Sequence, residues 1–172
     1  SLIRAAQNGK EVTVVVELMA RFDEEANIGW ATKLEQVGAH VVYGVVGYKT
    51  HAKALLIVRR EEGGLKRYAH LGTGNYHPRT ARLYTDFGLM TANDEVTRDV
   101  SEVFKQLTGL GQARTLKHLW RAPFTLHPKV VAGIQGEAEI ARSGGKARIV
   151  AKMNSLVEPE VIDALYQASQ AG

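Results

Sequence analysis

Residues 48–75 read YKTHAKALLIVRREEGGLKRYAHLGTGN. The apolar run from His51 to Val58 predicts a β-strand. The letters EEGG at 61–64 predict a hairpin turn, and Leu65–Leu71 predicts the returning strand. Gly72–Asn75 then predicts a glycine-rich loop. A hairpin with polar residues at its open end is therefore the centre of the predicted fold, and the segments on either side complete it.

Two further strands with a helix between them precede this hairpin. Val12–Leu18 is a nearly continuous β-branched run, which is typical of a strand buried on both faces. Val41–Val46 predicts a second strand, and Trp30, Leu34 and Val37 form an apolar stripe on the helix between them. Strand, helix and strand within about 35 residues form a βαβ unit, so we expect these two strands to be parallel.

The segment after the hairpin predicts one more strand and a long helix. Thr85–Met90 is expected to be a short strand. A helix then opens at Asp94, carries an apolar stripe from Val96 to Leu107, and ends at Gly109. The resulting fold class is α/β, with a sheet flanked by helices.

The pattern of the first residues returns near the end of the chain. A helix over 1–8, the turn Gly9-Lys10, a strand and a helix have counterparts in a helix over 128–142, the turn Gly145-Lys146, a strand over 147–153 and a helix over 159–170. This repeat predicts one domain over 1–115 and the beginning of a similar one over 120–172. A second copy of His51 would fall near residue 187, so we expect the chain to be an internal part of a longer protein.

Charge is concentrated around the hairpin. The whole chain carries +4, whereas eight lysines and arginines and two glutamates between Tyr48 and Arg82 give that segment +6 and the remainder −2. Such a field favours a polyanionic partner, although a solvated basic surface has the same composition. The absence of cysteine excludes disulfides and thiolate metal sites, and no apolar run approaches the length of a membrane-spanning helix.

His51 and Lys53 are the candidate reactive pair. Side chains two apart on a strand point to the same face, so we expect the two to stand side by side. A neutral imidazole is a nucleophile towards phosphorus, and an adjacent ammonium offsets the charge on phosphate oxygens. The backbone N–H groups of Gly72–Asn75 could approach the same anion. Two solvated side chains at the exposed start of a strand are the alternative interpretation.

These residues resemble a known family. His51-x-Lys53 followed by Gly72-Thr73-x-Asn75 resembles the phospholipase D superfamily, which transfers phosphoryl or phosphatidyl groups through a covalent histidine. Further segments narrow the resemblance to polyphosphate kinases of the phosphohistidine type: VELMARFDEEAN (16–27), KTHAK (49–53), HLGTGNY (70–76), TARLYTD (80–86), KMNSL (152–156) and IDALY (162–166). The resemblance covers essentially the whole chain, and it implies a phospholipase D-like mixed sheet flanked by helices in each of the two domains.

The resemblance implies roles for individual residues. His51 matches the histidine that is phosphorylated, Tyr84 matches a tyrosine of the ATP site, and Arg21 matches an arginine of the magnesium–triphosphate site. A guanidinium has no acceptor for a cation, so Arg21 would grip phosphate oxygens beside the metal. Lys53 is assigned to catalysis, and Asn75 and Arg82 to nucleotide binding. We expect Arg21, His51, Asn75 and Tyr84 to converge on one anion-sized pocket.

The implied activity is reversible transfer of the ATP γ-phosphate to inorganic polyphosphate, with Mg²⁺ as cofactor and ATP or ADP as substrate. The resemblance also implies a cytoplasmic homo-oligomer with peripheral membrane association and no nucleic acid as main ligand. Two alternatives stay open: a phospholipase D-type phosphodiesterase or nuclease, and a non-catalytic polyanion-binding module. The phospholipase D pattern has an Asp near Val58 that is missing here, which disfavours the phosphodiesterase and leaves open which group orients His51.

Overall fold

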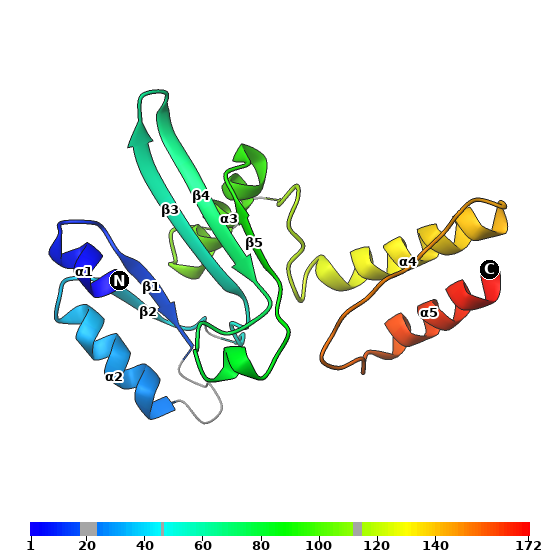
Figure 1. Ribbon diagram of the computed structural model, residues 1–172, viewed down its shortest axis with the longest axis horizontal. Helices are drawn as coiled ribbons and strands as arrows, with labels where there is room; N and C mark the ends of the chain where they lie inside the picture. Colours follow the sequence, from blue (N-terminus) through cyan, green and yellow to red (C-terminus); the bar gives the residue numbers. More distant parts are fainter. Residues whose placement is uncertain (18–23, 46, 112–114) are drawn as a thin grey trace. The chain divides into compact units, whose positions relative to one another are not determined.

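The computed structural model describes residues 1–17, 24–45, 47–111 and 115–172 (Figure 1). The chain consists of two compact units, Ser1–His118 and Leu119–Gly172. The elements of the first unit are α1 (Leu2–Gln7), β1 (Thr13–Val16), α2 (Glu24–Glu35), β2 (His40–Tyr43), β3 (Lys53–Glu61), β4 (Gly64–Gly72), the 3-10 turn η1 (Thr80–Arg82), β5 (Gly88–Thr91) and α3 (Asp94–Leu107).

The first two strands form a parallel pair, as the βαβ pattern predicts. β1 pairs with β2 from Thr13 opposite His40 to Val16 opposite Tyr43. Of the predicted stripe on α2, Leu34 is buried whereas Trp30 is 57% exposed, with the Lys33 ammonium 4.8 Å from its ring centroid. The valines of β1 are only half-buried, so the expected burial on both faces is wrong for the described strand, which has one partner strand among the described residues.

The hairpin is confirmed, and its two strands are the longest among the described residues. β3 and β4 are antiparallel from Lys53 opposite Gly72 to Glu61 opposite Gly64, which leaves a two-residue turn. β5 pairs with the other edge of β4, so the strand order is β3-β4-β5. The strand expected at Thr85–Met90 begins three residues later, at Gly88, because the pairing with β4 starts where Gly88 meets Gly72.

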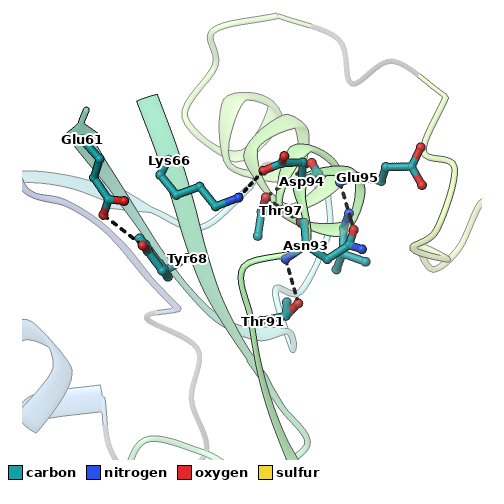
Figure 2. Close-up of polar contacts among 9 residues, drawn as sticks. Glu61, Lys66, Tyr68, Thr91, Asn93, Asp94, Glu95 and Thr97 are labelled. Atoms are coloured by element: carbon teal, nitrogen blue, oxygen red, sulfur yellow. Dashed lines mark hydrogen bonds and ion pairs between the residues drawn. The ribbon is translucent and has the colours of Figure 1, made fainter. Parts of the chain in front are cut away.

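Helix α3 begins where the sequence predicts, and its cap explains why. The Asn93 side chain accepts hydrogen bonds from the backbone N–H groups of Glu95 and Val96, at 3.0 and 3.1 Å (Figure 2). Lys66 of β4 reaches Asp94 in the first turn at 2.9 Å. Thr97 and Val100 are fully buried, so the helix packs as part of the core of this unit.

The second unit contains a pair of helices, α4 (Leu126–Arg142) and α5 (Pro159–Ala171). Their shared core consists of Val131, Ile134, Ala138, Ala164 and Ala168. His127 at the start of α4 lies 3.1 Å from the carboxylate of Glu158, which caps α5 by accepting from the Val161 N–H at 2.7 Å. Each helix start therefore helps to hold the other.

The strand expected over 147–153 is absent from this unit. Those residues form no regular structure, and no strand among the described residues pairs with them; the Arg148 N–H donates instead to the Glu137 carboxylate at 2.9 Å. A β-strand needs a neighbour to satisfy its backbone groups, whereas the apolar sequence pattern specifies only the extended conformation. The helix on either side of this segment agrees with the prediction to within two residues.

Candidate functional site

The candidate reactive pair, His51 and Lys53, lies at the beginning of β3. Lys53 is the first residue of the strand, whereas His51 precedes it and is exposed. The prediction that both stand on one face of a strand is therefore wrong for His51. The reason is the register: Lys53 pairs with Gly72, the last residue of β4, so the ladder has no partner for the residues before Lys53.

His51 and Lys53 are electrostatically coupled. The ammonium of Lys53 is the main cause that lowers the pKa of His51 below its ordinary value, and partial burial and Lys49 add to the effect. Partial burial lowers the pKa of Lys53 in turn, and the Asp86 carboxylate opposes that shift. A histidine with a lowered pKa is a neutral imidazole near pH 7, which is the nucleophilic form.

The backbone just before His51 is held from another strand. The Thr50 N–H donates to the Glu17 carboxylate at 2.9 Å, in a half-buried position. Glu17 directly follows β1, and its own carbonyl accepts from the Asn27 side chain of α2 at 3.1 Å. The end of β1 and helix α2 are thereby connected to the residue next to His51.

The glycine-rich loop is fixed by a residue far along the sequence. The Thr73 hydroxyl donates to the Asp86 carboxylate at 3.0 Å and accepts from the Phe87 N–H at 2.9 Å, and the Thr73 N–H donates to the Phe87 carbonyl at 3.0 Å. A Cβ at Gly74 would overlap the Asp86 carboxylate, so only glycine fits this approach. Because Asp86 also acts on Lys53, the loop and the lysine share one acidic neighbour.

Glycines make room for a second histidine. The His70 Nδ1 lies 2.7 Å from the Tyr76 hydroxyl, and a Cβ at Gly88 would come within 2.8 Å of His70 Nε2. By register, His70, Gly72 and Lys53 are on the same face of the sheet. The missing side chains at Gly72 and Gly88 therefore leave the space that the His70 imidazole occupies.

The structure does not bring every predicted site residue together. The side chains of Asn75, Arg82 and Tyr84 are exposed, 52% for Tyr84, and form no hydrogen bond with His51 or Lys53 among the described residues. Arg82 ends the 3-10 turn η1. Arg21 lies outside the described residues, so the predicted convergence of Arg21, His51, Asn75 and Tyr84 stays a prediction.

The polar groups around His51 and Lys53 suit phosphate oxygens better than a bare cation. No group of three or more His, Cys, Asp or Glu side chains that could hold a metal ion is found in the part of the chain that the structure describes. Lysine, imidazole, hydroxyl and backbone N–H groups bind anions.

Comparison with known families decides the relationship. The family model described as polyphosphate kinase C-terminal domain 1 matches residues 1–113, and polyphosphate kinase C-terminal domain 2 matches 119–172. The chain belongs to the polyphosphate kinase family. No helix among the described residues of this family member is both long and apolar enough to cross a membrane.

Individual polyphosphate kinases resemble this chain over its whole length. Those of Burkholderia vietnamiensis and Paraburkholderia phytofirmans are 68% and 69% identical over all of it. The chain spans only 26% of the length of each of these relatives. A crystal structure of polyphosphate kinase from Porphyromonas gingivalis superposes on 99% of this chain with a TM-score of 0.85 and 39% sequence identity. The superposed part is 29% of the Porphyromonas gingivalis chain. These similarities confirm the resemblance and the predicted α/β, phospholipase D-like fold class.

Two polar residues of this polyphosphate kinase region were missed by reasoning from the sequence. Asp86 is the one acidic residue between Glu62 and Asp94, and that isolation was a usable signal. Glu17 lies near the carboxyl end of the strand predicted over Val12–Leu18, close to the edge where ligand-binding residues of α/β sheets gather. Both lie inside segments on which the resemblance rests, but neither had been given a role.

Proposed function

We propose that this chain is the phosphohistidine-bearing part of an ATP:polyphosphate phosphotransferase, and that His51 accepts the γ-phosphate of ATP. The observation that carries the proposal is the exposed imidazole of His51 with its pKa lowered chiefly by Lys53. A candidate nucleophile that is uncharged at neutral pH thus has a cation as the main influence on its pKa, which supports the proposal.

The reaction follows from these two side chains. A ring nitrogen of His51 attacks the γ-phosphorus, the bond to the bridging oxygen of ADP breaks, and ADP leaves with that oxygen. The terminal oxygen of a polyphosphate chain then attacks the phosphohistidine, which restores the free imidazole. Lys53 offsets charge on the transferred phosphoryl oxygens in both steps, and each step can run in reverse.

The remaining site residues would serve the nucleotide. Asn75 and the backbone of the Thr73 loop supply donors for phosphate oxygens, Tyr84 offers an exposed aromatic ring, and Arg82 adds a cation. Arg21 would hold phosphate oxygens beside Mg²⁺ that arrives with ATP. These roles rest on the family resemblance together with the chemistry of each side chain.

The rest of the proposal concerns the whole protein. We infer that 1–115 is one phospholipase D-like domain and that 120–172 begins another, which is supported by the division into two units and by the separate family models. A cytoplasmic homo-oligomer with peripheral membrane association and with no nucleic acid as main ligand stays a prediction from the resemblance.

The test is covalent labelling of the full-length enzyme that contains this chain. Incubation with γ-labelled ATP and Mg²⁺ should place acid-labile, base-stable label on His51, as peptide mapping would show. His51→Ala should abolish both label and polymer synthesis. His40→Ala is the matched control, because His40 is also exposed but lies on β2, and it should keep both activities.

Polymer synthesis by the His51→Ala enzyme at the wild-type rate would refute the assignment. Cleavage of a phosphodiester without any labelled histidine intermediate on ATP would favour the phosphodiesterase instead. Salt-sensitive polyphosphate binding with no label on any histidine would favour the non-catalytic polyanion-binding module.

A further inference from the structure

His51 occupies a short segment that is held at both ends. On its carboxyl side, Lys53 is fixed by the β3–β4 ladder through its pairing with Gly72. On its amino side, Thr50 is fixed by the hydrogen bond from its N–H to the Glu17 carboxylate. Only His51 and Ala52 lie between these two anchors, and both are exposed and outside regular structure.

Of the two anchors, the hydrogen bond between the Thr50 N–H and the Glu17 carboxylate is the stronger candidate for fixing the position of His51. A hydrogen bond from a backbone N–H to a carboxylate is charge-assisted, and this one is half-buried, where competition from water is reduced. Glu17 is itself held, because the Asn27 side chain of α2 donates to its carbonyl at 3.1 Å. The backbone that carries His51 is thereby connected to β1 and α2, elements far from it in the sequence.

We propose that Glu17 is a positioning residue for the phosphoryl-accepting His51, acting through its hydrogen bond to the Thr50 N–H. This inference rests on the proposed function of His51. A nucleophile on an irregular segment attacks in line only if the backbone beneath it is fixed, and a misplacement of about 1 Å can cost about 100-fold in rate. Glu17 does not need to contact ATP for this effect.

The experiment uses single-turnover labelling of full-length enzyme with γ-labelled ATP and Mg²⁺. Glu17→Ala should lower the rate of His51 phosphorylation by about 10- to 100-fold while the KM for ATP changes little. Glu17→Gln retains an acceptor oxygen for the Thr50 N–H, so it should keep most of the rate. Glu11→Ala, which removes an exposed acid just before β1, is the matched control and should behave as wild type.

A second readout separates positioning from a general loss of stability. The Thr50 amide should exchange its hydrogen faster in Glu17→Ala, whereas the amides of β4 should keep their wild-type protection. Asn27→Ala, which removes the donor to the Glu17 carbonyl, should lower the labelling rate less, by about threefold. This milder variant covers the case in which Glu17→Ala fails to fold.

The outcomes are distinct. Wild-type labelling in Glu17→Ala, or an equal loss in Glu17→Gln and Glu17→Ala, would overturn the positioning role. A rise in the KM for ATP with an unchanged labelling rate at saturation would also overturn it, because Glu17 would then serve substrate binding. If the wild-type enzyme itself carries no label on His51, it is the proposed function that fails.

Discussion

At the scale of single residues, the charge state of His51 depends on its neighbours. Lys53 is the main cause of its lowered pKa, and Lys49 adds a smaller effect. Replacing Lys53 with Met should therefore raise the pKa of His51 towards its ordinary value, and Lys49→Met should raise it less. Protonated imidazole does not react with diethyl pyrocarbonate, so the midpoint of His51 modification should move to higher pH in both variants.

Lys66→Met is the control for this titration, because Lys66 pairs with Asp94 at the start of α3 and is no cause of the His51 shift. Modification of each histidine is followed by peptide mass spectrometry over a series of pH values. An unchanged midpoint in Lys53→Met would show that the ammonium does not act on His51, and the argument for a neutral nucleophile would lose its main physical cause.

The same scale shows what the sequence could predict of the site. His51 and Lys53 could be proposed because their chemistry is carried by two positions only two residues apart. Glu17 and Asp86 could at most have been singled out by position. Their partners could not be predicted, because Glu17 acts on Thr50, 33 positions away, and Asp86 acts on Thr73, 13 positions away, and such pairs are made by the fold.

At the scale of elements, the start of α3 depends on Asn93. Its side chain satisfies two N–H groups of the first turn, and its own N–H donates to the Thr91 hydroxyl at 3.1 Å (Figure 2). Asn93→Ala should lower the free energy of unfolding by about 1 kcal/mol. Asn93→Asp, which keeps the acceptor and suits the positive end of the helix, should cost little.

Urea or thermal unfolding followed by circular dichroism would measure both variants of Asn93. Equal stability of the alanine and aspartate variants would contradict the capping role. The surface pair Lys66–Asp94 next to the cap is exposed, so its loss should matter less than the loss of the cap.

The elements also show where prediction from the sequence ends. The β3–β4 hairpin was predictable because EEGG supplies a local turn and fixes the register. Residues 147–153 have an equally clear apolar pattern, yet they pair with no described strand. Turn chemistry is local, whereas the partner of a parallel strand is remote in sequence, so the second kind of pairing cannot be read from the segment itself.

At the scale of the whole molecule, the two units have separate cores. Ile134 of α4 is 7% exposed and belongs to the cluster with Val131, Ala138, Ala164 and Ala168. Ile134→Ala should destabilise this cluster by about 2–5 kcal/mol, because it removes apolar contacts and leaves a cavity. The matched control is Val150→Ala in the same unit, where the side chain is 77% exposed.

Hydrogen exchange of the full-length protein distinguishes a local from a global effect of Ile134→Ala. The amides of α4 and α5 should lose protection, and those of β4 in the first unit should not, because local unfolding follows the contacts of each core. Val150→Ala should change neither set. If β4 lost protection to the same extent as α4, the two units would unfold as one cooperative body, and the site around His51 would depend on the packing of the second unit.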